Sequence, residues 1–481
     1  MAVNLAVSRP HGAGAVAIRV GMQTLVPALT GRLASHNIAC RCLKLRNRVL
    51  SREGPRCAKA GKTMGRDIPN LRRRWRTGLV ARWQRRWRLT RRGRLVFGSL
   101  GVLLLLLTSS LVGSWVRDAP LAKGLSPSSS RPGERSERAG GVAGRGFTLV
   151  ASGDVLTHGA VLERAGAYGR RVGQPYDFRP MFADLRPIVA KADLALCHLE
   201  VPLSRNGQDI SSWPAFNAPP QLAAALRWAG YDACSTASNH SLDQGPQGVA
   251  ATLEVMDAAG LGHPGMARNA NEADQSTIVD VRGLPVGLLS YTYGLNSGRL
   301  PADRPWLVNT IEPRRILNDA KNARRAGAQF VVVLLHWGQE YRSAPTPFQR
   351  EVAKRLLGAP EVDLILGHHV HVVQPIERVG SKWVAYGMGN SLSNQTPGCC
   401  AAGSQDGVLV KVTVGEHAGR LRARTVRYVP TWVEHPSFRI RPVLTALADR
   451  SLPAATRRAL EAARDRTTRA VGPTARPAPP R

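Results

Sequence analysis

Val362-Asp363-Leu364-Ile365-Leu366-Gly367-His368-His369-Val370-His371 is the stretch that decides the fold and locates its site. The apolar run over 362–366 predicts a buried strand, and three histidines follow close to its carboxyl end. Open α/β sheets bind their ligands at that end of their strands. Imidazole is the commonest metal ligand in proteins, so the histidines indicate a metal site, although a solvated polar turn would also accommodate them. A metal site requires matching ligands from the rest of the chain.

Four further strands are predicted to end in a residue that can ligate a metal. Asp154 follows 147–151, Glu200 follows 192–197, Asn239 and His240 follow 232–237, and His336 follows 330–335. Singly, these residues have ordinary explanations, such as a turn or loop acid, a helix cap or a buried histidine. Five such strand ends in one chain are hard to obtain by chance. An α/β sheet brings strand ends from distant segments together into one site.

The types of candidate ligand indicate which metal ions and which reaction this site would suit. Carboxylate, amide and imidazole groups suit Mn²⁺, Zn²⁺ or Fe²⁺ better than Ca²⁺ or Mg²⁺. Six or seven candidate ligands are too many for one open catalytic ion and fit two divalent ions, which can activate a water and hold the oxygens of an in-line displacement. His240, next to Asn239, is then free to hydrogen-bond a substrate oxygen or to protonate a leaving group. The predicted reaction class is phosphoester hydrolysis.

The strongly basic composition comes mainly from the N-terminal part of the chain. Of the formal net charge of +34, residues 1–94 contribute +21, with 23 Lys and Arg against 2 Asp and Glu. Residues 95–116 are uncharged and mostly apolar, and they are long enough for one transmembrane helix. Because the arginines precede this segment, the positive-inside rule predicts a single-pass cell-membrane protein with a cytoplasmic N-terminus and an extracytoplasmic domain. The membrane segment explains the charge, so nucleic-acid binding is not expected.

The chain is predicted to have five parts. Residues 1–94 form a basic, largely disordered cytoplasmic segment, in which 1–63 show no sustained periodicity and Met64 offers a better native start. The transmembrane helix at 95–116 and a flexible linker at 117–146 lead into a folded domain over 147–445. A C-terminal helix and a disordered tail occupy 446–481.

Within the domain, apolar strands alternate with helical stretches, which is typical of an α/β protein. Beyond the strands already named, the sequence predicts helices at 220–229, 247–259, 313–326 and 347–357, a hairpin at 278–281 and 286–291, and further strands at 372–378, 382–386, 407–414 and 421–429. Cys197 and Cys234 are predicted to be buried as small apolar residues, and no disulfide framework is implied.

The order of these motifs resembles that of CapA-type proteins of poly-γ-glutamate capsule synthesis, over about 147–395. The motifs are Ser152-Gly-Asp154, Leu199-Glu200-Val-Pro202, Ser238-Asn-His240-Ser-Leu-Asp243-Gln-Gly245, His336-Trp-Gly-Gln-Glu340-Tyr341, Gly367 to His371, and Gly389-Asn390. This family is similar to the calcineurin-like metallophosphoesterases. The resemblance implies a four-layer α-β-β-α sandwich of two mixed sheets, and a membrane-anchored role in making or exporting an anionic polymer.

The expected site residues follow from the motifs and the resemblance together. The metal ligands are expected to be Asp154, Glu200, Asn239, His336, His369 and His371. His240 is the expected acid or transition-state donor, oriented by Asp243, while His368, Glu340, Tyr341 and Asn390 are assigned to substrate binding. His368 could equally ligate the metal, and Glu340 and Tyr341 could equally serve packing.

One position departs from the superfamily, and one alternative function stays open. The usual start is Asp-x-His, but Leu156 stands at the third position here, so one ligand is missing unless His158 substitutes. The predicted enzyme is a metal-dependent hydrolase acting on a phosphoester or an anionic polymer. The alternative is a non-catalytic polymer-binding or export subunit that works with other capsule-synthesis subunits at the membrane.

Overall fold

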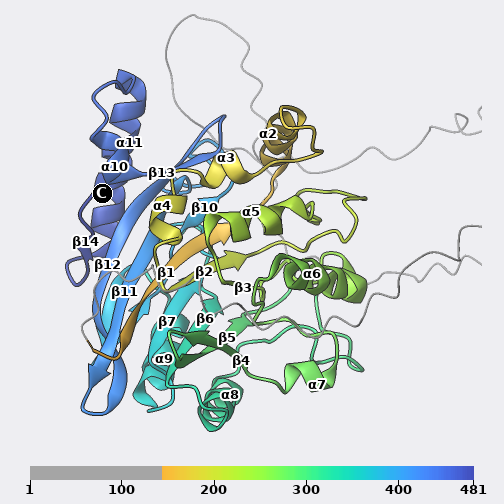
Figure 1. Cartoon of the computed structure of the whole chain (residues 1–481), viewed down its shortest axis with the longest axis vertical. Coiled ribbons are helices and arrows are strands. Elements are labelled where there is room, and N and C mark those ends of the chain that lie inside the picture. Colours follow the sequence, from red (N-terminus) through yellow and green to blue (C-terminus); the bar gives the residue numbers. More distant parts are fainter. Residues whose placement is uncertain (1–143, 481) are drawn as a thin grey trace, which may run out of the picture. The chain divides into compact units, whose positions relative to one another are not determined.

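Two mixed β-sheets face each other, and helices cover the outer side of each sheet (Figure 1). The computed structural model of the chain describes residues 144–480, which contain all of these elements. One sheet is built around β1 (Gly146–Val155) and the other around β6 (Phe330–His336). The arrangement agrees with the α-β-β-α layers expected from the sequence.

The first sheet has the strand order β13-β12-β11-β1-β2-β3, with β10 paired to β1 and β14 paired to β12. Its other strands are β2 (Leu194–Leu199), β3 (Ala233–Ser235), β10 (Asn390–Leu392), β11 (Asp406–His417), β12 (Arg420–Glu434), β13 (Arg439–Pro442) and β14 (Arg476–Pro477). β2 runs parallel to both β1 and β3, so the carboxyl ends of these three strands meet at one edge. β11, β12 and β13 extend the sheet as antiparallel neighbours.

The second sheet has the order β4-β5-β6-β7-β9-β8. Its other strands are β4 (Thr277–Val281), β5 (Leu284–Thr292), β7 (Leu364–His368), β8 (Ile376–Val379) and β9 (Lys382–Ala385). β5, β6, β7 and β9 are parallel, and the predicted hairpin joins β4 to β5. Its turn lies at Arg282-Gly283, where both residues have positive φ (58° and 76°), as a two-residue hairpin with the sheet's twist requires.

Side chains along the central strands alternate between two apolar cores. On β2, Leu194 and Leu196 lie in the core between the sheets, whereas Ala195 and Cys197 face the helices. β6 and β7 alternate in the same way. Because both faces are covered, these strands appear in the sequence as continuous apolar runs.

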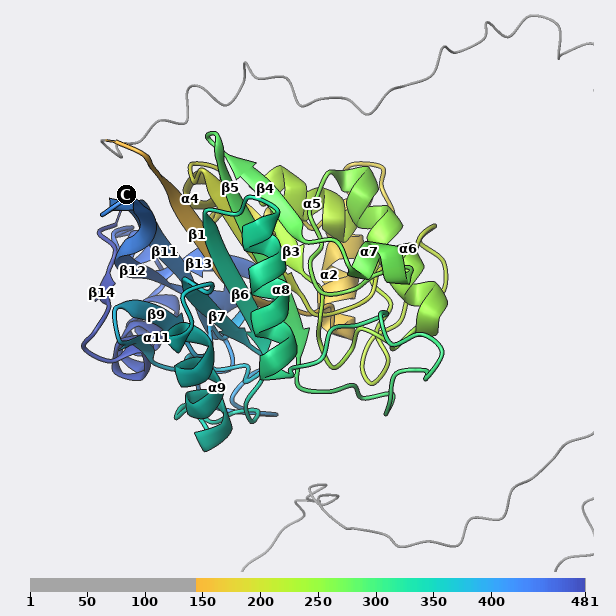
Figure 2. The ribbon, with the colours of Figure 1, turned by 90° about the horizontal axis from the view of Figure 1, so that it is seen from below.

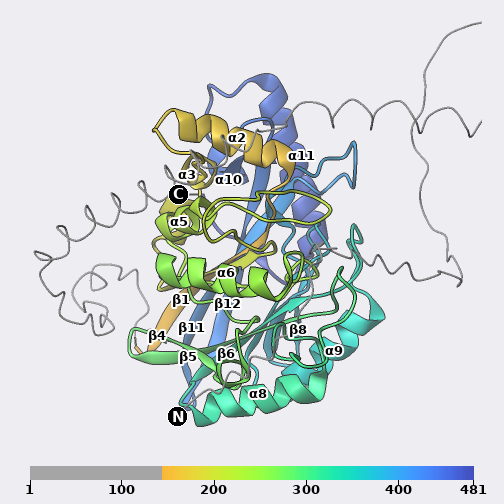
Figure 3. The same cartoon turned by 90° about the vertical axis from the view of Figure 1, so that its right-hand side faces the viewer.

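Most of the helices pack outside the two sheets. Those outside the first sheet are α2 (Gly159–Arg170), α3 (Arg179–Phe182), α4 (Arg186–Val189), α5 (Gln221–Ala229) and α6 (Gly245–Ala259). Those outside the second are α8 (Pro313–Arg325) and α9 (Pro347–Gly358), and the remaining helices are α7 (Ala270–Ala273), α10 (Val443–Leu447) and α11 (Ala454–Val471). Figure 2 shows α8 against β5 and β6, and Figure 3 shows α5 and α6 side by side.

Local signals in the sequence explain where two of these helices begin and end. α6 ends at Gly260, whose φ of 69° is left-handed and costs glycine little. α9 begins with a capping box, in which the Thr346 side chain accepts from the Gln349 N–H and the Gln349 side chain accepts from the Thr346 N–H.

Cys197 and Cys234 form a disulfide with their Cα atoms 4.3 Å apart. The sequence predicted that both would be buried, which is confirmed, but treated them as separate apolar residues, which is wrong. The two cysteines are register partners on the adjacent parallel strands β2 and β3. This pairing depends on strand order and register, which the spacing of cysteines in the sequence does not contain.

Two other segments differ from expectation. The strand predicted at 372–378 is reduced to β8; before it, the Gln374 backbone N–H donates to the Gly387 carbonyl at 2.9 Å, and its buried side-chain amide donates to the Arg342 carbonyl. Disorder was expected after α11, whereas β14 pairs with β12 and the Ala478 N–H donates to the Tyr428 carbonyl at 2.7 Å.

The predicted transmembrane helix at 95–116, the cytoplasmic segment 1–94 and the linker up to 143 lie outside the described residues. The last linker residue, Gly146, already belongs to β1. Within 144–480, no helix has the length and apolar character needed to cross a bilayer.

Gly367→Ala is expected to lower the free energy of unfolding by about 3 kcal/mol, because overpacking against rigid backbone is destabilising. A Cβ at this position would overlap the Tyr386 carbonyl and lie 2.6 Å from Trp337 Nε1. Urea denaturation of the purified full-length chain measures the change. Gly358→Ala is the matched control, since its Cβ would meet nothing within 4 Å and should leave stability unchanged or slightly higher. Equal stability of the two variants would contradict the packing described here.

Candidate metal centre

The carboxyl ends of four strands bring acidic and imidazole side chains together between the two sheets. Asp154 on β1 is the register partner of His198 on β2, and His336 on β6 is the register partner of His368 on β7. Glu200 follows β2 directly. Each of these side chains is at most 1% exposed, so the polar cluster is as buried as the apolar core beneath it.

Strand alternation places the three strand histidines at the site. His198 continues the inward-facing series of Leu194 and Leu196 on β2, and His336 and His368 continue the equivalent series on β6 and β7. His198 was not among the predicted ligands. The signal that could have found it is its spacing of two residues from Glu200, which puts both side chains on one face of an extended chain.

Asp154 reaches the site through an irregularity in β1. Ala151 pairs with Leu196 and Asp154 pairs with His198, so β1 contains one more residue than β2 between these two pairs. Without the extra residue, Asp154 would face the helices with Val150. A β-bulge of this kind re-aims a side chain, and bulges are common beside active sites.

The Asp154 carboxylate binds the segment that follows β7. Its Oδ1 accepts from His368 Nδ1 at 2.9 Å, and its Oδ2 accepts from the His369 N–H at 3.0 Å and lies 3.2 Å from His371 Nδ1. Burial alone would raise the pKa of Asp154, but the hydrogen bonds from His368 and His371 hold that pKa well below its usual range. A carboxylate has about four lone-pair positions, so Asp154 can hold these groups and still ligate a cation.

His369 and His371 have left-handed backbones, with φ of 88° and 56°. Such conformations are costly for residues other than glycine, and they concentrate at functional sites. Here they turn the chain so that the His369 N–H and the His371 ring both reach Asp154. The segment 368–371 is therefore a built feature of the site rather than a solvated turn.

The buried donor atoms of this cluster fit a divalent metal. Within the described residues, the following atoms are buried without any hydrogen-bond partner: His198 Nε2, Glu200 Oε1 and Oε2, His336 Nδ1, His368 Nε2 and His369 Nδ1. Three groups have ligand atoms within 4.8 Å of one another: Asp154-His198-His368, His198-Glu200-His336 and Asp154-Glu200-His371. Unpaired buried polar atoms are costly, and a shared cation would satisfy them.

Most of the imidazoles are neutral and ready to ligate. Burial and the neighbouring imidazoles hold the pKa values of His198 and His336 well below the usual range. Burial and His371 lower the pKa of His369 to about 3. Since a metal binds only the neutral imidazole, these three rings need lose no proton on binding.

Glu200 and His371 together hold one proton. Burial raises the pKa of Glu200 well above its usual range. Burial alone would lower the pKa of His371, but the charges of Glu200 and Asp154 raise it to about 9. With Glu200 Oε1 3.6 Å from His371 Nε2, the proton lies on one partner or the other near neutral pH. A cation must displace it.

A histidine–carboxylate pair adjoins the cluster on the first-sheet side. His240 Nδ1 lies 2.7 Å from Asp243 Oδ2, which also accepts from the Phe216 N–H at 2.8 Å. Asn296, which was not predicted from the sequence, contacts both His240 and Asn239. Asn239 in turn places its Oδ1 2.9 Å from His336 Nε2. His240 and Asp243 thus form a hydrogen-bonded pair, and Asn239 contacts His336, one of the candidate ligands.

Of the remaining predicted residues, Asn390 is buried beside the centre, and Glu340 and Tyr341 are exposed. Asn390 is buried and its Oδ1 lies 3.0 Å from His371 Nδ1, so it orients that ring rather than facing a substrate. Glu340 is exposed. Tyr341 is 36% exposed and its ring lies 6.1 Å from that of His371. Tyr293, which was not predicted, is 46% exposed and lies 4.4 Å from the His369 ring.

His158 does not replace the missing Asp-x-His ligand. Leu156 is buried among the helices outside the first sheet, and His158 Nδ1 accepts from the Asn394 N–H at 3.3 Å. Neither residue belongs to the three ligand groups. The imidazole beside Asp154 comes instead from His198 on the neighbouring strand.

Comparison with known proteins identifies related sequences. A sequence profile described as bacterial capsule synthesis protein PGA_cap matches residues 148–395. The capsule biosynthesis protein CapA of Bacillus anthracis is 26% identical over 256 residues, covering 52% of this chain and 60% of that protein. A probable polyglutamine synthesis accessory protein of Mycobacterium tuberculosis is 28% identical over 233 residues, covering 46% and 61%. The alignments span less than two thirds of these relatives.

Among solved structures, a 5'-nucleotidase precursor from Thermus thermophilus is 16% identical, with a TM-score of 0.37 over 59% of this chain and 54% of that one. The calcineurin-like phosphoesterase YfkN from Bacillus subtilis is 12% identical, with a TM-score of 0.35 over 66% and 99%. Likenesses this distant assign no activity to this chain.

Binding of Mn²⁺ to the EDTA-treated full-length chain is expected to release about one proton per centre near neutral pH, because the cation displaces the proton shared by Glu200 and His371. Affinity is expected to rise with pH up to about 9, the pKa of His371. Isothermal titration calorimetry in buffers of different ionisation enthalpy counts the protons. His417→Ala, on an exposed strand end of β11, should behave as the parent chain does. A binding enthalpy that is the same in every buffer would refute the shared proton.

Proposed function

The chain belongs to the PGA_cap family of bacterial capsule synthesis proteins, and on this premise we propose that its domain is a metal-dependent hydrolase of phosphoester-type bonds in cell-surface polymer synthesis. One observation carries the proposal. Buried donor atoms without partners lie at the ends of β2, β6 and β7, and Asn239 and Asn296 link this cluster to the His240–Asp243 pair. A set of ligands beside a proton-transfer pair is the arrangement that metal-assisted hydrolysis requires.

Some residues of the centre would bind the metal directly, and hydrogen bonds from others orient the imidazole rings. Asp154, His198, Glu200, His336, His368, His369 and His371 would hold one or two divalent ions, with Mn²⁺, Zn²⁺ and Fe²⁺ as the ions that suit these donors. Such an ion supplies Lewis acidity and lowers the pKa of a bound water. Asn390 orients His371, and Asp154 orients His368 through its Nδ1. Second contacts of this kind fix the ring and leave the other nitrogen for the metal.

His240 is proposed as the residue that moves a proton at the substrate. Asp243 accepts a hydrogen bond from His240 Nδ1–H, which fixes the tautomer and leaves Nε2 to give or take a proton. The side chain is only 8% exposed, and the Phe216 ring packs edge-on against it at 4.7 Å. Phe216 thus excludes water from one side of the imidazole, and its N–H keeps Asp243 in place.

The substrate is proposed to be an anionic cell-surface polymer or a phosphoester linked to its synthesis. Tyr293 and Tyr341 present exposed rings next to His369 and His371, so they offer aromatic walls to a chain entering the centre. The relative in Bacillus anthracis is named a capsule biosynthesis protein. Other subunits of a capsule-synthesis complex are the proposed partners.

We place the domain outside the cell membrane, anchored by the apolar segment 95–116 with the N-terminus in the cytoplasm. Arginines precede that segment, which supports this orientation. The Cys197–Cys234 disulfide supports it independently, because disulfides persist mainly in oxidising, extracytoplasmic compartments.

A second candidate is a polymer-handling subunit without catalytic activity. The relative in Mycobacterium tuberculosis is named an accessory protein, which favours this possibility. Under this alternative the same ligands hold a structural ion or an ion that binds polymer carboxylates. The two candidates differ in whether His240 matters for bond cleavage.

His240→Ala is expected to lower kcat for bis-p-nitrophenyl phosphate about 100-fold or more in the Mn²⁺-loaded full-length chain, because general acid–base catalysis contributes about that factor. Metal content, measured by mass spectrometry, should stay unchanged, because His240 is not among the ligand groups. Asp243→Asn should also lower kcat, since it removes the acceptor that fixes the His240 tautomer.

The exposed His417→Ala variant serves as the control and should keep full activity. Equal activity in His240→Ala and the parent chain would exclude the proposed mechanism. Metal binding without any hydrolysis would favour the polymer-handling alternative.

A further inference from the structure

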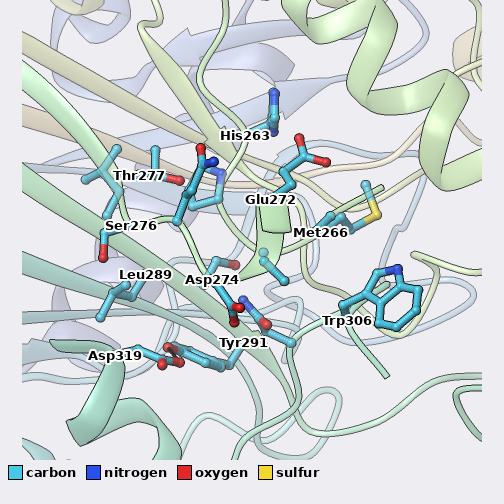
Figure 4. Close-up of a pocket in the computed structure, with 18 of the residues that line it drawn as sticks. His263, Met266, Glu272, Asp274, Ser276, Thr277, Leu289, Tyr291, Trp306 and Asp319 are labelled. Carbon is cyan, nitrogen blue, oxygen red and sulfur yellow. Dashed lines mark hydrogen bonds between the residues drawn. The ribbon is translucent and has the colours of Figure 1, made fainter. Parts of the chain in front are cut away.

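A cavity of about 500 Å³ lies at the edge of the second sheet (Figure 4). It is bounded by β4, β5, α7, α8 and the segments 263–267 and 305–309. No residue of the three metal-ligand groups lines it. Small-molecule sites have volumes of about 300–1,000 Å³, so this cavity has room for one ligand of monosaccharide size.

The cavity lining is acidic. Figure 4 shows the Tyr291–Asp319 pair on one side of the cavity and Met266 and Trp306 on another. Three carboxylates, of Glu272, Asp274 and Asp319, line the cavity against a single arginine, Arg315. These charges would repel a carboxylate-rich ligand and attract a cation.

The charged side chains at the cavity differ in whether another side chain pairs with them. Arg315 donates to Asn309 Oδ1 at 2.8 Å and lies 3.7 Å from Asp319. Glu272 is paired with Arg268 at 3.4 Å. In residues 144–480, no hydrogen bond or ion pair reaches the Asp274 carboxylate. One negative charge at this cavity is therefore left for a ligand.

Burial raises the pKa of Asp319, hydrogen bonding from Tyr291 and the charge of Arg315 oppose that rise, and the Asp274 charge adds to it. The Tyr291 hydroxyl donates to Asp319 Oδ2 at 2.8 Å, which leaves Oδ1 open to a further donor. A positively charged group between Asp274 and Asp319 would relieve their mutual repulsion.

A neutral group at the cavity wall also lacks a partner. Ser290 is 1% exposed and lines the cavity, and its hydroxyl forms no hydrogen bond within the described part of the chain. Buried polar groups are normally satisfied, so this hydroxyl indicates a ligand that offers a hydroxyl group.

We propose that this cavity binds a small polyhydroxylated amine, of the size of one amino sugar. The protonated amine would lie between the Asp274 and Asp319 carboxylates, and a ring hydroxyl would meet Ser290. The Trp306 ring offers an apolar face to the sugar ring. This site is separate from the metal centre and does not depend on hydrolysis there.

Three sugars test the charge argument: glucose, and glucosamine and glucuronate, each of which differs from glucose in one group. The full-length chain in detergent is titrated with each by calorimetry, at a mildly acidic pH where the glucosamine amine is protonated. Glucosamine should bind saturably, and glucose and glucuronate should bind at least about tenfold more weakly, because each lacks the charge-assisted hydrogen bond. EDTA should leave the binding unchanged.

Asp274→Asn should weaken glucosamine binding about tenfold while glucose binding stays the same. Its side chain is exposed and has no partner, so the variant should fold, which circular dichroism verifies. Asp303→Asn is the matched control, since that carboxylate is 73% exposed and does not line the cavity.

The proposal is overturned if glucosamine does not bind saturably or if glucuronate binds as well as glucosamine. It is also overturned if Asp274→Asn binds glucosamine like Asp303→Asn. Loss of Mn²⁺-dependent hydrolysis has no bearing on these outcomes, so failure of the two proposals can be told apart.

Discussion

The buried Asp154 carboxylate holds the two sheets together at the site. It stands at the end of β1 in the first sheet, yet its partners are the rings of His368 and His371 and the N–H of His369, all at the end of β7 in the second sheet. A buried charge without compensation costs several kcal/mol, so the sandwich closes favourably only when this segment meets Asp154. Closing the fold and assembling the metal ligands are therefore one event. The left-handed backbones of His369 and His371 are tolerated because these contacts depend on them.

Much of this arrangement could be predicted because the strands alternate strictly. The period of two along β6 and β7 carries inward-facing side chains directly to His336 and His368, and parallel pairing brings those strand ends together. The helices and the β4–β5 hairpin follow from equally local signals, such as Gly260 after α6 and Arg282-Gly283 in the turn. Helices and turns that depend on a few neighbouring residues were predicted within a few residues of their observed positions.

The unpredicted features depend on contacts between distant segments. Simple alternation from Leu149 would turn Asp154 toward the helices, and only the bulge between Ala151 and Asp154 directs it inward. Asn296 lies in a loop without any motif, and its contact with His240 exists only because β5 and β3 end near one another. Tyr293 was missed for the same reason. Local pattern therefore predicted most of the candidate ligands that cluster here, but it missed the surrounding residues, which only tertiary packing brings to the site.

The Cys197–Cys234 disulfide and His198 show how one pairing serves both stability and the site. The two cysteines face the helices, and one step further along the same parallel pair His198 meets Ser235. The Ser235 hydroxyl lies 3.4 Å from the Cys197 carbonyl oxygen and 2.8 Å from His198 Nδ1. In the tautomer with the proton on Nδ1, His198 donates to Ser235, and Nε2, which has no partner, carries the lone pair that a metal needs. The covalent link between β2 and β3 thus holds in register the hydrogen bond that orients the His198 ring, and it places beside Asp154 the candidate imidazole ligand that Leu156 cannot provide.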